Sequence, residues 1–159
     1  MTTDDRFVKR DRMRYTKNSL SSSLALLAIV FNVLYFVSIY QSDKGKFYYT
    51  ILIGASVLYN LVFMLMAFLS SEGVKNYKSG YSWLLMALGV GQIVRIFILP
   101  QQAHQTIVQN ASVMDDGQYA YVLFCLIASA VCCVVSAVIN LIKSRQLAEH
   151  TASLEKLAL

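Results

Sequence analysis

Gln92 and Arg95 stand three residues apart in an otherwise apolar stretch, so both lie on one face of a helix. An ionisable residue inside a membrane helix costs about 2.5–3.5 kcal/mol and is a functional hypothesis by default. Arg95 precedes Pro100 by five residues, and its long side chain can snorkel to a nearby interface, which is the first expectation. The alternative is that Arg95 faces the bundle or a partner and holds a carboxylate or carbonyl group. Asp115 and Asp116 are then the nearest acids of the chain.

Three asparagines stand inside three other apolar stretches: Asn32, Asn60 and Asn140. A side-chain amide in hydrocarbon must find a partner or remain unsatisfied, so such residues link helices, each link being worth about 0.6 kcal/mol on average. We expect these asparagines to hold helices together, and a ligand site is the alternative. With Gln92 and Arg95 they are also the candidate intramembrane polar contacts for a partner.

Small residues recur every four positions along the last apolar stretch. Two adjoining rows make one broad face, called here the small-residue face: Cys125, Ser129, Cys133 and Ala137 in one row, and Ala128, Cys132, Ser136 and Asn140 in the other. Small side chains let helix backbones approach closely in lipid. This face is therefore predicted to be the main helix-packing surface, within the bundle or against a partner. Gly54, Ser56, Gly89 and Gly91 are the surfaces that it is expected to meet.

The chemistry-bearing residues do not form a catalytic or metal-binding set. The cysteines have no C-x-x-C spacing, and adjacent Cys132 and Cys133 point about 100° apart on a helix, so we expect small hydrophobes without redox or metal function. His104 and His150 lie outside the apolar stretches and cannot both ligate a membrane haem. No Ser/His/Asp set, phosphate loop or zinc motif is present. The sequence predicts a non-enzyme without cofactor.

The composition indicates an integral membrane protein. Of 159 residues, 57% are hydrophobic and 14% charged, and the mean hydropathy is +0.52. Soluble domains have about 45–50% apolar and 25% charged residues. These values exclude a soluble enzyme, a disordered tail and a nucleic-acid-binding module.

Four apolar stretches are each long enough to cross a membrane as a helix. They cover residues 20–40, 47–69, 81–99 and 119–142, and none contains Asp, Glu or Lys. About 20 helical residues cross a hydrocarbon core, where the backbone must satisfy its own hydrogen bonds. The first stretch ends without a small-residue cleavage site, so we interpret it as a retained span. The sequence predicts an all-α, four-helix membrane bundle in a single domain, residues 1–159.

The basic residues predict the orientation of this bundle. Eleven lie in the N-terminal segment 1–19, the loop after the second span and the tail 143–159, against two, Lys44 and Lys46, on the other side. Such a bias places both termini in the cytoplasm. Residues 4–17 carry a net charge of +3 and would be attracted to anionic membrane lipid, although a topology anchor is the preferred interpretation over specific recognition.

The extramembrane segments give two further expectations. Residues 106–108 and 112–114 favour a short hairpin, followed by a turn at Asp115-Asp116-Gly117. After Ile142, good helix formers predict that the fourth span continues as a cytoplasmic helix. Its weak apolar stripe of Leu147, Thr151, Leu154 and Ala158 packs on its own protein or the membrane surface, or alternatively on a partner.

Three segments give the chain a resemblance to a known group: Phe7–Tyr15, Gly73–Lys78 and Gln92–Pro100. With the four-span layout they resemble small uncharacterised membrane proteins of anaerobic Gram-positive bacteria that are encoded beside sugar-type ABC transporters. The resemblance covers most of the chain and carries no motif of known chemistry. It implies a multi-pass accessory subunit in the bacterial plasma membrane.

Two functions remain open from the sequence. In the first, the chain is a non-catalytic subunit that packs onto a larger membrane complex, or onto itself, through the fourth span or the Gln92/Arg95 face. Leucine at Ser129 and Cys133 should then disrupt that complex. In the second, several copies form a small transporter or channel along Asn32, Asn60, Gln92, Arg95 and Asn140. A membrane enzyme acting on lipid has the least support.

Overall fold

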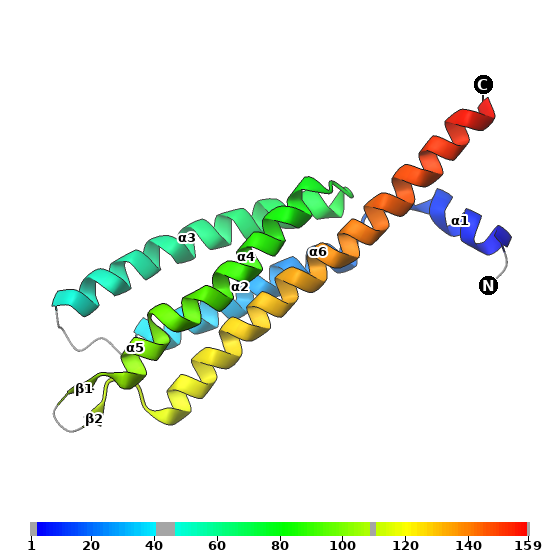
Figure 1. Ribbon diagram of the computed structural model, residues 1–159. Coiled ribbons are helices and arrows are strands. Elements are labelled where there is room, and N and C mark those ends of the chain that lie inside the picture. The colour runs from blue at the N-terminus through cyan, green and yellow to red at the C-terminus, as the bar shows by residue number, and fades with distance from the viewer. Residues whose placement is uncertain (1–2, 41–46, 109–110, 159) are drawn as a thin grey trace.

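The computed structural model describes residues 3–40, 47–108 and 111–158 (Figure 1). Its elements are, in chain order, α1 (Thr3–Met13), α2 (Ser19–Tyr40), α3 (Phe47–Lys75), α4 (Gly80–Ile98), α5 (Pro100–Gln105), β1 (Ile107–Val108), β2 (Ala111–Ser112) and α6 (Asp116–Ala158). The described chain is thus helical apart from one very short hairpin.

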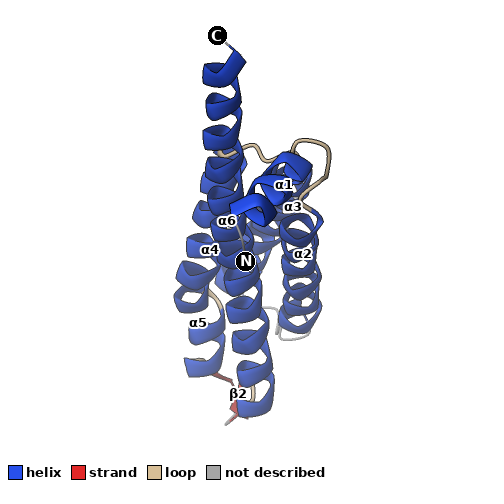
Figure 2. Ribbon diagram, turned by 90° about the vertical axis from the view of Figure 1, so that its right-hand side faces the viewer, coloured by secondary structure: helices blue, strands red, loops and turns tan. Residues whose placement is uncertain are grey.

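The four long helices form a bundle in which each one packs against two neighbours. Helix α2 packs on α3 and α6, and helix α4 packs on the same two helices from the other side (Figures 1 and 2). Helices α3 and α6 therefore occupy opposite corners of the bundle. This arrangement lets side chains of α2 and α4 meet at the centre.

Among the described residues, four helices are long and apolar enough to span a membrane: Ser19–Ile39, Gly54–Lys75, Ser79–Gln105 and Asp116–Lys156. The predicted all-α class and the four spans are confirmed at this level. Large apolar side chains, including Leu58, Val90, Phe97 and Phe124, point outward from all around the bundle. An apolar exterior of this extent suits hydrocarbon and not water.

Two helices lie where the sequence analysis expected none. Helix α1 begins with acidic Asp4 and Asp5 and ends with basic Arg10 and Arg12, which suits the helix dipole at both ends. Helix α5 starts at Pro100, whose fixed φ fits the first helical position. A hairpin is present near its expected place, with antiparallel pairs Ile107↔Ser112 and Val108↔Ala111, but its second strand is Ala111–Ser112 and not residues 112–114.

Both ends of the described chain lie at the same end of the bundle, and the hairpin lies at the opposite end (Figure 1). Helix α6 continues beyond the bundle, as predicted, and α1 packs on this extension (Figure 2). The Phe7 and His150 rings meet edge to face at 4.8 Å, and His150 Nε2 lies 3.4 Å from Asp11 Oδ1. His150 is only 3% exposed, so α6 packs on α1 at this point, whereas Leu147, Thr151 and Leu154 of the predicted apolar stripe are only partly buried.

The turn between α3 and α4 is closed by its own backbone. The Lys78 N–H bonds the Gly73 carbonyl and the Tyr77 N–H bonds the Val74 carbonyl, the pattern of a Schellman motif. Tyr77 has a φ of 57°, in the left-handed region that such a motif requires. Gly73 is needed for packing, because a Cβ at this position would overlap the ring of Tyr81.

Candidate functional site

Arg95 lies in the interior of the bundle, with 5% of its surface exposed. Helix α4 turns one face inward, and Leu85, Gly89 and Gln92 lie on that face with Arg95. These positions are three or four residues apart, the helical spacing that keeps residues on one side. Arg95 therefore points to the helices and not to the interface.

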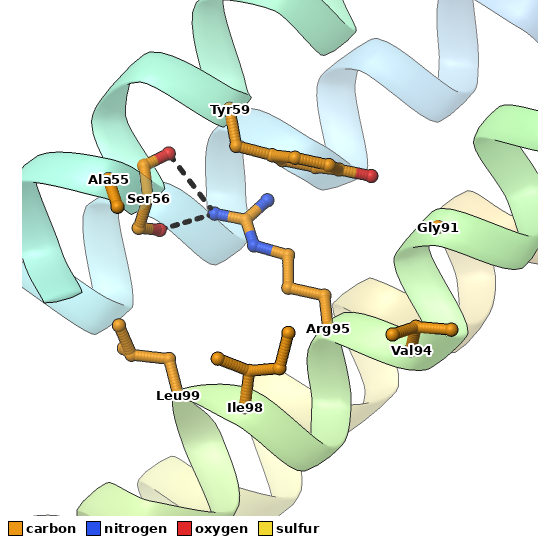
Figure 3. Close-up of a pocket in the computed structure, with 8 residues that line it drawn as sticks. All are labelled: Ala55, Ser56, Tyr59, Gly91, Val94, Arg95, Ile98 and Leu99. Atoms are coloured by element: carbon orange, nitrogen blue, oxygen red, sulfur yellow. Dashed lines mark hydrogen bonds between the residues drawn. The ribbon is translucent and has the colours of Figure 1, made fainter.

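The Arg95 guanidinium ties α4 to α2 and α3. Its Nη1 donates hydrogen bonds to Asn32 Oδ1 at 3.2 Å and to Asn60 Oδ1 at 2.8 Å. Its Nη2 donates to Ser56 Oγ and, at 3.5 Å, to the Ser56 carbonyl oxygen (Figure 3). All these acceptors are neutral.

Two tyrosine rings complete the surroundings of the guanidinium. Arg95 Cζ lies 4.2 Å from the ring centroid of Tyr35 and 4.7 Å from that of Tyr59. A cation over an aromatic face is attracted by the ring quadrupole, by about 2 kcal/mol when both groups are desolvated. Tyr59 is thus placed mid-bundle by a specific partner.

The first expectation for Arg95, that it snorkels to the interface, is wrong. The rotation of α4 directs the side chain inward, where Asn32, Asn60 and Ser56 offer oxygen atoms within reach. The expected acids are also not its partners: Asp115 and Asp116 are both exposed. Asp115 Oδ1 accepts the Gln118 N–H at the start of α6, and Asp116 Oδ1 lies 3.8 Å from His104 Nε2. Arg95 holds amide, hydroxyl and carbonyl oxygens instead of a carboxylate.

Gln92 extends this group of polar side chains to the fourth helix. Its Nε2 donates to Asn32 Oδ1 at 2.9 Å and to Ser129 Oγ at 3.4 Å. We call Asn32, Ser56, Asn60, Gln92 and Arg95 the Arg95 cluster. It joins α2, α3 and α4, and through Ser129 it reaches α6, so Asn32 and Asn60 link helices as expected.

Several polar atoms of the Arg95 cluster and its neighbour Tyr35 are buried without a hydrogen-bond partner. They are Asn32 Nδ2, Asn60 Nδ2, Gln92 Oε1 and the Tyr35 hydroxyl. The two Nδ2 groups can only donate, as can the guanidinium, so the cluster has more hydrogen-bond donors than nearby acceptors. A donor left unpaired in a low-dielectric interior costs about 1–3 kcal/mol.

Asn140 has no hydrogen bond to the Arg95 cluster among its bonds in the described chain; its partners are Asn18, Ser82 and Lys78. It lies near the end of the bundle that carries the termini, where its Oδ1 accepts a bond from Asn18 Nδ2 at 3.2 Å. Its Nδ2 donates to Ser82 Oγ at 2.8 Å and to the Lys78 carbonyl at 3.1 Å. Lys143 Nζ bonds Asn18 Oδ1 at 3.0 Å. Asn140 therefore joins α6 to α4 and to the start of α2, and it does not extend the Arg95 cluster.

The small-residue face of α6 packs inside the bundle. Its members Cys125, Ser129, Cys133, Ser136, Ala137 and Asn140 are buried, whereas Ala128 and Cys132 are partly buried. Ser136 Oγ donates to the Ser21 carbonyl at 2.7 Å, and Ser21 Oγ donates to the Ser136 carbonyl at 2.6 Å. Ser129 Oγ donates to the Ala28 carbonyl at 2.9 Å. These bonds bring the backbones of α2 and α6 into close approach.

Three of the four surfaces expected to meet the small-residue face do not. A Cβ at Gly89 would lie 3.0 Å from Val134 Cγ2, so this glycine does pack on α6. A Cβ at Gly91 would meet the Tyr59 hydroxyl instead, a Cβ at Gly54 would meet no other segment within 4 Å, and Ser56 bonds Arg95. The main partner is the face of α2 that carries Ser21, Ala25 and Ala28.

A pocket of about 360 Å³ lies beside the guanidinium, between α3 and α4 (Figure 3). Its lining consists of Ala55, Ser56, Tyr59, Gly91, Val94, Arg95, Ile98 and Leu99. Val94 and Ile98 are 52% and 48% exposed, so the pocket opens on the outer surface of the bundle. Apart from Ser56, Tyr59 and Arg95, its walls are apolar.

Sequence reasoning missed Ser56 and Tyr35 as partners of Arg95. Ser56 stands four residues before Asn60, and this spacing places both on one face of the second span. Tyr35 stands three residues after Asn32, which is the same kind of signal on the first span. A polar face on each of two spans was thus readable in the sequence.

No group of three or more His, Cys, Asp or Glu side chains suited to a metal ion lies together in the part of the chain that the structure describes. Cys125, Cys132 and Cys133 are free thiols. Comparison of the chain with protein-family models, with curated proteins and with solved structures finds no match. The function must therefore be argued from the geometry.

Proposed function

We propose that the chain is a non-catalytic integral membrane protein that serves as an accessory subunit of a larger membrane complex. Four spans anchor it with both termini in the cytoplasm, and the helices outside the bundle contact the partner. The resemblance noted in the sequence favours a bacterial plasma membrane and a transporter as the larger complex.

The length of α6 is the observation that carries this proposal. Its 43 residues measure about 65 Å at 1.5 Å per residue, roughly twice a hydrocarbon core of about 30 Å. The last contacts of α6 with the bundle include Asn140 and Lys143, both bonded to Asn18. The helix beyond Lys143 is longer than anchoring requires.

The part of α6 beyond Lys143 is held in position by a second helix. Helix α1 packs against it through Phe7, Asp11 and the buried His150. A helix fixed by a second helix loses less conformational freedom on binding than a free tail does, which favours affinity. Outward-facing Glu149 and Glu155 on α6 remain available to a partner.

The surfaces first considered for docking are used within the bundle. The small-residue face meets α2 and α4, and the Gln92/Arg95 face meets α2 and α3. We therefore assign the partner contact to the projecting pair, α1 and α6 beyond Lys143. Membrane lipid surrounds the rest.

The test is purification at native expression in mild detergent, with quantitative identification of co-purifying proteins. We expect one companion in constant ratio to the full chain. The charge-reversed double variant Glu149→Lys/Glu155→Lys should lose the companion and keep its helical content. The matched control is Val131→Leu, on the lipid-facing side of α6, which should retain the companion.

Two results would contradict the proposal. One is a chain that purifies without any companion in constant ratio. The other is ion conductance or solute uptake by the purified chain in liposomes, lost in Arg95→Ala, which would establish the transporter or channel alternative instead.

A further inference from the structure

The pocket between α3 and α4 combines a buried cation with apolar walls. Arg95 forms its charged end, Gly91, Val94 and Ile98 line it from the same helix, and Leu99 lines it from the position directly after that helix. Ala55, Ser56 and Tyr59 close it from α3 (Figure 3). A site of this composition suits a molecule with one anionic group and one apolar part.

The cation has no negative partner within the described chain. Its bonded acceptors are the neutral oxygens of Asn32, Asn60 and Ser56, and no ion pair to Arg95 forms among the described residues. No Asp or Glu stands within the four spans. Desolvation of an unpaired charge is costly, and the cost falls when an anion is brought into contact with it.

The hydrogen-bond groups around the guanidinium differ in whether they line this pocket. Asn32 Nδ2 and Asn60 Nδ2 are buried donors without partners, but both residues line a separate cavity between α2 and α3 and not this pocket. An anionic oxygen in the pocket would therefore act on Arg95, adding a charged acceptor to the neutral ones that the guanidinium already has. Gln92 Oε1 is the one buried atom of the cluster that can only accept and has no partner.

The opening of the pocket determines how such a molecule reaches Arg95. The exposed Val94 and Ile98 place the mouth on the outward, apolar surface of the bundle. Leu99 lies one turn from Arg95 toward the hairpin end, and Gly91 lies one turn the other way, toward the middle of the bundle. An anionic head at Arg95 can therefore direct its chain past Gly91 and Val94 toward the bilayer centre, the orientation of an ordinary membrane lipid.

We propose that this pocket binds one anionic amphiphile from the membrane, with a carboxylate or phosphate head on Arg95 and an apolar chain between α3 and α4. The volume of about 360 Å³ lies within the usual range of small-molecule sites, about 300–1,000 Å³. A partner helix, about 10 Å across, could insert only one side chain there. The inference does not depend on the accessory role.

The test uses native mass spectrometry of the purified full chain in a neutral detergent. Three probes are added in turn: oleate, lysophosphatidate with an oleoyl chain, and uncharged oleyl alcohol. We expect one oleate or one lysophosphatidate per chain, with at least tenfold lower occupancy by oleyl alcohol. Which of the two anions is retained identifies the head group.

Two matched variants locate the site. Val94→Phe should lower the occupancy by the anionic probe about tenfold, because the ring enters the pocket. Val62→Phe is the control, since Val62 on α3 is also 52% exposed but does not line this pocket. Arg95→Lys should keep the preference for anions and Arg95→Gln should lose it.

Each remaining outcome overturns the proposal. Equal retention of oleate and oleyl alcohol would show that the pocket binds apolar chains without recognising the charge of the head group. Unchanged binding by Val94→Phe would place the ligand elsewhere. An isolated chain that retains none of the probes would leave Arg95 to the carboxylate of a partner protein. The Val94→Phe and probe comparisons stand even if Arg95→Gln fails to fold.

Discussion

Cys133→Leu tests whether the small-residue face holds this bundle together or serves a partner. Cys133 is completely buried in a cluster with Ala25, Ala28, Leu85 and Ala137, which come from α2, α4 and α6. A Cβ at Gly89 would lie 3.5 Å from Cys133 Cβ, so the α4 backbone is in close contact with this position. These contacts leave no room for a larger side chain at position 133.

The expected cost can be worked out from this packing. Leucine adds two heavy atoms to the side chain, and forcing additional atoms into a packed interior costs about 1–3 kcal/mol. Transfer of the leucine out of lipid gives no compensating hydrophobic gain, because lipid is as apolar as the bundle interior. We therefore expect the free energy of unfolding to fall by about 1–3 kcal/mol. Ser129→Leu should cost about 1 kcal/mol more, because it also removes two interhelical hydrogen bonds, with Ala28 and Gln92.

The assay is reversible unfolding of the purified chain by SDS in mixed micelles, followed by circular dichroism. The control is Val131→Leu, two residues from both Ser129 and Cys133 but 53% exposed on the outward side of α6, which should change the unfolding free energy by less than about 0.5 kcal/mol. The reasoning is refuted if Cys133→Leu unfolds at the wild-type SDS concentration. If that variant stays folded but loses a companion protein, the small-residue face binds a partner and does not hold the bundle together.

Three further predictions concern other contacts. Ser21→Ala and Ser136→Ala each remove a hydroxyl bond to the other residue's carbonyl and should each lower the free energy of unfolding by about 0.6 kcal/mol. A double-mutant cycle should show coupling, since the two hydroxyl oxygens lie 2.9 Å apart, and additive effects would argue against that contact. Phe7→Ala removes the ring that packs on the α6 histidine and should increase hydrogen exchange in α1 while leaving the bundle unchanged; unchanged exchange in α1 would contradict the packing. Gly73→Ala should destabilise the chain by about 1–3 kcal/mol in the same SDS assay, because its Cβ overlaps the Tyr81 ring, and a neutral result would count against that close approach.

The sequence was sufficient for the four long helices because a helix that crosses hydrocarbon needs a long apolar stretch. Uninterrupted apolar length predicted four spans, and the absence of helix breakers after Ile142 predicted that the last one continues. Helix α1 was missed because its charges were interpreted only as an orientation signal. The acidic start and basic end of that segment were nevertheless a helix signal.

The candidate site was only partly predictable. Gln92 and Arg95 were identified, and their three-residue spacing placed them on one face, but each span is apolar on nearly all sides. The sequence therefore did not fix how α4 is rotated, and distance from Pro100 wrongly favoured snorkelling. Likewise, the small-residue face of α6 was found, but its partner was sought among glycines. The serine and alanines of α2 at positions 21, 25 and 28 carry the same small-residue spacing and are the actual contact.

The proposed function requires that four helices cross the membrane with both ends of the chain on the cytoplasmic side. The most direct measurement is a pair of fusions in bacteria, one at each end of the chain, each made with green fluorescent protein and with alkaline phosphatase. We expect fluorescence and no phosphatase activity from both ends. Phosphatase activity from one end and fluorescence from the other would require an odd number of crossings and would contradict the account.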